Sequence, residues 1–309
     1  MKIRPLPSST LASILLLGTV LVWGATFVIV KDALVDASPL LFNLIRMTLA
    51  SLVLAAINWR SLRQITRSQL VRGSFVGVFL AAGYQFQTAG LARTTAAKSA
   101  FLTGLVVVFV PLLTVLPRLR PAAAPRPGWS TMLGTLLAFA GLFLLTTPSG
   151  TVLSNLAGAL GLGDLLSLVC ALAFAAHLLT LAHFSPGIPA PLLASVQIAA
   201  SAVVMAASLP LESHPYVLFT PRLLIALLVT SILATAAAFT IQSYAQQHLP
   251  PTQTAILLTL EPVFAALTSV LFLHEHLGSR AMGGACLILG GIVCIEFLAP
   301  RPLPAEIPA

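Results

Sequence analysis

Charge is scarce in this sequence. Charged residues make up 8% of the 309 residues, and acids are the rarer sign, with eight Asp and Glu against sixteen Lys and Arg. A soluble domain carries about 25% charged residues, whereas 58% of this chain is hydrophobic. A water-soluble fold of this length cannot hide so much apolar surface, so the composition predicts an integral membrane protein.

Cysteines and catalytic motifs are also few. Cys170, Cys286 and Cys294 lie in apolar segments without metal-ligand spacing, so we predict no disulfide framework, metal site or bound cofactor. The sequence contains no His-Glu-x-x-His, Gly-x-Ser-x-Gly or P-loop motif, which excludes the usual metalloproteases, serine hydrolases and ATP-driven pumps. We therefore predict that the chain is not an enzyme.

One short motif keeps an enzyme as a remote alternative. Residues Gly161 to Asp164 read GLGD, which matches the Gly-x-Gly-Asp pattern of intramembrane aspartyl proteases. That chemistry needs two carboxyls in one site, and Asp32 and Asp36 lie together in a loop. Asp164 is better placed to stabilise the beginning of a helix.

Apolar runs of membrane-spanning length dominate the chain. A bilayer core about 30 Å thick needs roughly 20 apolar residues per helix. Runs of this kind, separated by Pro- and Gly-containing breaks, predict ten transmembrane helices over residues 11–30, 39–58, 71–91, 97–117, 129–147, 161–183, 189–209, 222–244, 252–273 and 280–298.

The basic residues orient these helices. With the N-terminus inside, inside loops hold ten Lys and Arg, outside loops hold five, and Arg46 lies within a span. The cytoplasmic side of a membrane protein keeps the excess of basic residues, so we predict that both termini are cytoplasmic. The net charge of +8 is spread singly or in threes over short loops, which does not indicate a nucleic-acid partner.

The chain contains an internal repeat. At an offset of about 151 residues Trp23 falls on Phe174, Arg46 on Gln197 and Pro111 on Pro262. This predicts two domains, residues 1–150 and 151–309. Five spans per repeat place the second repeat upside down relative to the first, and such inverted repeats are typical of secondary transporters.

Three segments carry a family resemblance: WGATFVIVK at residues 23–31, LARTTAAKSAFLTGLVVVFVPLL at 91–113 and AFTIQSYAQQHLPPTQTAILLTLEPVFAALTSVLFLHE at 238–275. With these segments the sequence resembles the EamA family of the drug/metabolite transporter superfamily. His274 and His276 flank Glu275 where the family commonly has a Gly-Glu pair. The resemblance implies two inverted five-helix repeats, a central cavity between helices 1, 3, 4, 6, 8 and 9, and export of small metabolites, amino acids or drugs across a bacterial plasma membrane.

Glu261 is the strongest candidate for coupling. It lies nine residues into a predicted span, about 14 Å deep, where a charged acid costs about 2.5–3.5 kcal/mol and usually faces a cavity or proton relay. The alternative is a structural carboxyl beside the bend that Pro262, like Pro111, introduces. His177 is a second coupling candidate because histidine titrates near neutrality, although a lone histidine in an apolar helix is often a core residue.

The other candidates for substrate binding are aromatic, amide or basic. Trp23 and Phe101 can stack on a planar or apolar substrate, and Lys98 can attract an anionic group, unless these residues pack in the core or reach the interface. Tyr84, Gln85 and Gln242 form polar patches on equivalent helices, and their polar groups need partners in hydrocarbon. Arg46, about 10 Å deep, is expected to bond to neighbouring backbone or lipid phosphate.

The sequence therefore predicts a secondary exporter that works by alternating access. Proton antiport through Glu261 is the preferred hypothesis. Facilitative metabolite exchange and lipid flipping are the alternatives within the transporter class. The expected partners are a small-molecule substrate, the bilayer and protons, and the sequence leaves a monomer and a homodimer equally open.

Overall fold

The computed structural model describes residues 8–298 except 95, 123, 125, 148–160, 213 and 274–277. The described residues form helices and a single isolated bridge between Ala37 and Val217, without strands. The first half contains α1 (Ser8–Ala33), α2 (Pro39–Ile57), α3 (Trp59–Leu62), α4 (Arg67–Leu91), α5 (Ala96–Gly104), α6 (Val106–Val115) and α7 (Trp129–Thr146). The second half contains α9 (Leu162–Phe184), α10 (Ala190–Ser208), the 3-10 turn η1 (Leu209–Leu211), α11 (Pro221–Ser231), the π-helix η2 (Ile232–Ala237), α12 (Ala238–Gln246), α13 (Pro251–Leu258), α14 (Leu260–Leu273) and α15 (Ser279–Leu298).

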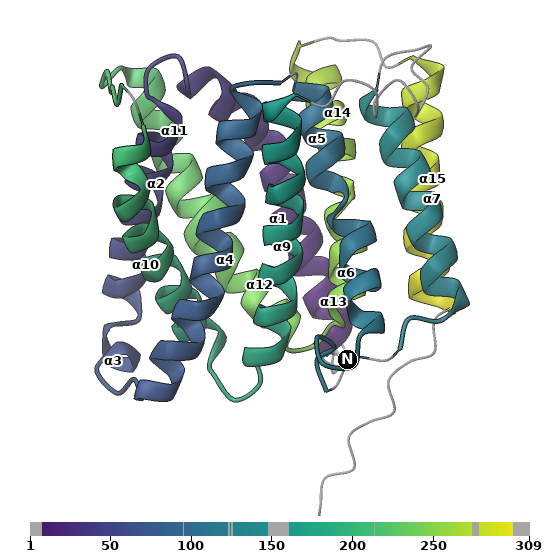
Figure 1. Cartoon of the computed structure of the whole chain (residues 1–309), viewed down its shortest axis with the longest axis horizontal. Coiled ribbons are helices and arrows are strands. Elements are labelled where there is room, and N and C mark those ends of the chain that lie inside the picture. The colour runs from purple at the N-terminus through teal and green to yellow at the C-terminus, as the bar shows by residue number, and fades with distance from the viewer. Residues whose placement is uncertain are drawn as a thin grey trace, which may run out of the picture.

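The helices stand side by side as one bundle (Figure 1). Helix occupies each of the ten ranges predicted from apolar runs. Three ranges are interrupted, at Leu105 between α5 and α6, at Thr259 between α13 and α14, and by the π-helix between α11 and α12. Among the described residues, six helical segments are long and apolar enough to cross a membrane.

Local capping determines where several helices begin. Thr66 and Gln69 form a reciprocal capping box at the start of α4, and the Thr220 hydroxyl accepts the Leu223 N–H at 3.1 Å at the start of α11. Asp164 accepts the Gly161 N–H at 2.9 Å and the Thr94 hydroxyl at 2.6 Å. The interpretation of Asp164 as a residue that stabilises a helix N-terminus is confirmed.

Glycines bring α7 and α15 into close contact at one edge of the bundle (Figure 1). A Cβ on Gly141 would lie 2.5 Å from the Gly284 carbonyl oxygen, and one on Gly134 would lie 2.7 Å from that of Gly291. These four glycines, seven apart on each helix, therefore serve packing within the chain, as helix pairs in membranes commonly do.

A polar contact joins the two halves at the end of the bundle opposite α3. The Asp36 carboxylate accepts two hydrogen bonds from Arg222, at 2.8 and 2.9 Å, and one from Thr220 at 2.7 Å. We call Asp36, Thr220 and Arg222 the Asp36 clasp. Hydrogen bonds from Arg222 and Thr220 hold the pKa of Asp36 below its ordinary value, because they favour the charged form.

Candidate functional site

A cluster of aromatic and polar side chains lies where helices of both halves meet. Trp23 of α1, Arg46 of α2, Tyr84 of α4, His177 of α9 and Phe239 of α12 belong to it, and we call these five residues the central cluster. Phe239 contacts three of its members, with ring centroids 5.5 Å from Trp23, 6.2 Å from Tyr84 and 5.9 Å from His177. Aromatic contacts at these separations stabilise the packing of one ring against another.

Arg46 is the buried cation of the central cluster, with 5% of its surface exposed. Its Nε donates to the Thr235 hydroxyl at 2.7 Å, and its Nη2 donates to the Ala234 carbonyl at 3.1 Å and the Tyr84 hydroxyl at 3.3 Å. The expectation that Arg46 bonds to neighbouring backbone is confirmed. All three acceptors are neutral, and no carboxylate of the described residues lies within ion-pair distance of Arg46.

The π-helix η2 supplies two of these acceptors. The Ala234 carbonyl also accepts the Trp23 indole N–H at 2.8 Å, so α1 and α2 both bond to the same peptide of the opposite half. A π-helix changes the register of the backbone hydrogen bonds, and such segments are frequent at functional sites. The Ala234 peptide in this distorted segment is thus one of the points at which the two halves are hydrogen-bonded.

The partners of Arg46 are related by the repeat. At the offset of about 151 residues Tyr84 corresponds to Thr235, and both accept hydrogen bonds from Arg46. The same offset relates Trp23 to Phe174 and Gly83 to Ala234. Trp23 bonds to Ala234, while the Phe174 ring packs where a Cβ on Gly83 would lie. The central cluster therefore follows the internal repeat.

His177 belongs to a hydrogen-bonded chain within the second half. Its Nε2 lies 2.9 Å from Oε1 of Gln197, whose Nε2 donates to the Ser243 hydroxyl at 2.9 Å. Because the Gln197 amide donates to Ser243, its oxygen faces the histidine, and we assign Nε2 of His177 as protonated. His177 and Gln197 are fully buried, so this chain holds α9, α10 and α12 in register.

Glu261 lies in the first turn of α14, close to the beginning of the segment that follows the helix break at Thr259. Its side chain is partly exposed. Gly24 of α1 faces it, since a Cβ there would lie 2.7 Å from the Glu261 carbonyl oxygen. Glu261 is thus an acid beside the central cluster, separate from the acceptors of Arg46.

Gln242 and Gln85, two other predicted site residues, differ in how their amide groups are hydrogen-bonded. Gln242 of α12 is buried, and its Oε1 has no hydrogen-bond partner among the described residues. A buried polar atom of this kind calls for a water or a ligand. Gln85 instead bonds to Asn43 at 3.2 Å and to Ser208 at 2.7 Å, which links α4 to α2 and to the end of α10.

Phe101 packs on α7 rather than on the central cluster, and each of the two prolines follows a helix break. Phe101 packs on Phe139 and Phe143 of α7, at 5.7 and 5.6 Å. Pro262 lies three residues after the break at Thr259, and Pro111 lies inside α6, six residues after the break at Leu105. The side chain of Lys98 and residues 274–277, with His274, Glu275 and His276, are outside the described part of the structure.

Sequence reasoning omitted Arg46, Thr235 and Gln197 from the candidate site. A signal was present, because Arg46 is the only Lys or Arg that lies more than two residues from the end of a predicted span, and it corresponds to Gln197 in the repeat. Applying the same offset to Tyr84 gives Thr235. Threonine is common in apolar helices, where its hydroxyl can bond to the preceding turn, so Thr235 alone carried no signal.

Comparison with known proteins gives a consistent result. The model of the EamA-like transporter family matches residues 10–147 and again 161–297. A relative in Archaeoglobus fulgidus, named an uncharacterized transporter, is 32% identical over 89% of this chain and 82% of its own length. The uncharacterized transporter YwfM of Bacillus subtilis is 27% identical over 90% of this chain and 91% of its own. A solved crystal structure aligns with a TM-score of 0.75 and 18% identity over 94% of this chain and 99% of that one, which shows the likeness in fold.

Proposed function

Because this chain belongs to the EamA-like transporter family, and is therefore a multi-pass membrane transporter, we propose that it exports small metabolites, amino acids or drugs by proton-coupled alternating access. The family match and the named relatives support transport itself. We place the protein in the inner (plasma) membrane of a bacterium. The direction of transport and the coupling to protons are our inference from the site.

The observation that carries the proposal is the combination of Arg46 and Glu261 where the halves meet. Arg46 is buried with neutral acceptors only, and Glu261 is an acid beside the same cluster, where α14 meets Gly24 of α1. A buried charge without a fully paired counter-ion is costly, so natural membrane proteins keep one mainly for function. Two opposite charges that are not locked together leave Glu261 free to exchange a proton against a substrate.

The proposed architecture is ten membrane-spanning helices in two inverted repeats, residues 1–150 and 151–309, with both termini cytoplasmic. Two observations support the division into two repeats: the family model matches each half separately, and Arg46 bonds to the equivalent residues Tyr84 and Thr235. Inverted repeats exchange inward- and outward-open forms around a site at their interface. The central cluster lies at that interface.

In the proposed cycle, this chain's residues have distinct roles. Glu261 carries the proton, and the unsatisfied Oε1 of Gln242 offers substrate a hydrogen bond. Trp23 and Phe239 provide aromatic surface for the substrate, while His177 positions α12 through Gln197. Asp164 caps a helix, which argues against the protease reading of the GLGD motif.

The test is uptake into inside-out vesicles with Glu261→Gln. We would measure labelled amino acids, nucleosides, sugar phosphates and cationic dyes, each with the pH gradient intact and collapsed. We expect gradient-driven accumulation by the wild type and none by the variant. The matched control is Glu212→Gln, because Glu212 accepts the Leu40 N–H at 3.0 Å in the outer loop, away from the cluster.

Folding has to be separated from coupling. We therefore expect Glu261→Gln to unfold in detergent at nearly the wild-type temperature. Accumulation that survives in Glu261→Gln with its gradient dependence intact would overturn the coupling role. Wild-type uptake that only equilibrates, whether or not a gradient is applied, would replace the proton exporter with a facilitative exchanger.

A further inference from the structure

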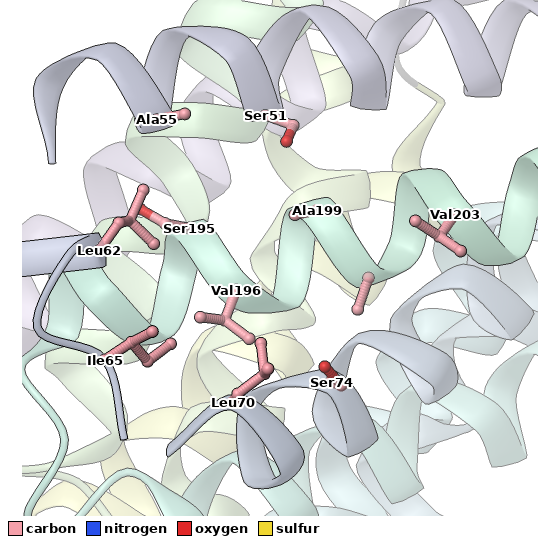
Figure 2. A pocket seen from close by; sticks show the side chains of 11 residues that line it. Ser51, Ala55, Leu62, Ile65, Leu70, Ser74, Ser195, Val196, Ala199 and Val203 are labelled. Carbon is pink, nitrogen blue, oxygen red and sulfur yellow. The ribbon is translucent and has the colours of Figure 1, made fainter. Parts of the chain in front are cut away.

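A groove on the side of the bundle has the features of a lipid site. It lies between α2, the beginning of α4 and α10, and has a volume of about 290 Å³. Figure 2 shows α10 between the two other helices, with Ala199 and Val203 along it, Ser51 and Ala55 on α2, and Leu70 on α4. We call this the α2/α4/α10 groove. We propose that it binds one acyl chain of an anionic phospholipid, with the headgroup held by arginines at its α3 end.

The walls of the groove suit a hydrocarbon chain. Most of its lining residues are apolar, and Leu70 and Val203 are exposed on the flank of the bundle. From Ser195 to Val203 the floor runs about 12 Å along α10, at 1.5 Å per residue. A helix with side chains is about 10–12 Å wide and does not fit this volume, whereas a single chain does.

The groove is preformed. Gly73 faces Val196 so closely that a Cβ there would lie 2.6 Å from the valine side chain, and the Ser201 hydroxyl donates to the Gly77 carbonyl at 2.9 Å. On the other side the Asn58 amide donates to the Ser195 hydroxyl at 3.1 Å. These contacts fix α4 and α2 against α10. Because the groove is already ordered, binding a ligand there does not cost the entropy of ordering the protein.

One end of the groove is strongly basic. Leu62 and Ile65 close it there (Figure 2), and the adjoining Arg60, Arg63 and Arg67 are exposed. The sequence has no Asp or Glu between Asp36 and Asp164, so no acid of the same segment neutralises these arginines. Charge complementarity therefore selects an anionic headgroup, as basic pockets between membrane helices do.

Trp59 places this end at the membrane surface. Its ring is 57% exposed, and the Arg63 guanidinium lies over it at 5.1 Å from the centroid. Tryptophan is enriched at the level of lipid headgroups. α3 and the beginning of α1 lie at the same end of the bundle (Figure 1), the end for which the excess of basic residues predicts the cytoplasmic side. Anionic lipids are abundant in that leaflet.

The experiment is native mass spectrometry of the full chain with phosphatidylglycerol or phosphatidylcholine of identical acyl chains. We expect the wild type to retain phosphatidylglycerol preferentially. The triple variant Arg60→Gln, Arg63→Gln, Arg67→Gln should lose that preference, by about fivefold for each arginine removed. The matched control removes Arg118 and Arg126, which are exposed and remote in sequence from the groove.

A second pair of variants tests the groove itself. Ala199→Phe fills it and should reduce retention of both lipids, whereas Leu136→Phe on the exposed face of α7 should leave retention unchanged. Equal losses in the Arg118 and Arg126 control, or unchanged retention in Ala199→Phe, would overturn the site in favour of diffuse attraction. A disulfide-linked dimer formed efficiently through Val203→Cys would overturn it by showing a second copy in the groove. None of these measurements depends on transport.

Discussion

Arg46 and Gln197 occupy the same position in the two halves and do different work. Gln197 bonds to His177 and Ser243 and stays within the second half. Arg46 bonds to Tyr84 of its own half and to Ala234 and Thr235 of the other. At equivalent positions, the neutral amide of Gln197 thus bonds within one half, whereas the cation of Arg46 bonds across the two halves. The comparison teaches that two positions related by the sequence offset differ in charge where the two halves meet.

The largest effect is expected when this difference is erased. Arg46→Gln gives the first half the residue of the second and removes charge-assisted hydrogen bonds of about 1.5–3 kcal/mol each. The variant also relieves the burial of a guanidinium, which offsets part of that loss. We therefore expect transport in vesicles to fall at least about tenfold, with a smaller change in the unfolding temperature. Wild-type transport by this variant would contradict a functional role for Arg46.

A smaller effect is expected on the neutral side of the comparison. His177→Phe leaves the buried Gln197 oxygen without its partner, which costs about 1–3 kcal/mol of stability. Thermal unfolding should show that loss, and transport per folded molecule should keep its dependence on the pH gradient. If the gradient dependence disappears while the fold survives, His177 carries protons rather than positions α12.

Glycine contacts sharpen the comparison further. Gly24→Ala and Gly141→Ala each place a Cβ within 3 Å of a backbone carbonyl, and overpacking of this kind costs typically about 1–3 kcal/mol. We expect both variants to unfold at lower temperature. Gly24 adjoins Glu261, whereas Gly141 lies in the α7 and α15 contact, so only Gly24→Ala should slow transport. Equal transport by the two variants would separate α1 from the coupling step.

The smallest effect is expected at the Asp36 clasp, where the carboxylate and the guanidinium are paired. Asp36→Asn removes the carboxylate that Arg222 and Thr220 bind. Because the folded protein holds the pKa of Asp36 below its ordinary value, the clasp stabilises the fold above about pH 4 and loses this contribution as the pH falls further. The variant should unfold a few degrees lower at pH 7, and the difference should vanish in acid. A difference that persists at pH 2 would assign the effect to packing.

The positions of the helices could be predicted from the sequence, because each apolar run had to be satisfied by helix in hydrocarbon. The interruptions within the helices were harder to predict from the sequence. The π-helix reads ILATAA, with neither Pro nor Gly, so the sequence carries no local signal for it; in the structure its Ala234 carbonyl accepts hydrogen bonds from Trp23 and Arg46. At the site, Trp23, Tyr84 and His177 come together, whereas Gln85 and Phe101 face α10 and α7. The direction in which a helix presents its polar side chains depends on the neighbouring helices. A single sequence does not give the positions of those neighbours.

The two hydrogen bonds that the Ala234 carbonyl accepts, from Trp23 and Arg46, bear on how α12 can rotate. A π-helix holds one residue more than the α-helix that would replace it, and each residue turns an α-helix by about 100°. If η2 relaxed to α geometry, α12 would rotate against α11 and carry Phe239 and Gln242 to a different face. The hydrogen bonds from Trp23 and Arg46 to Ala234 therefore oppose this rotation. Breaking them would allow the side chains at the centre of the protein to change direction.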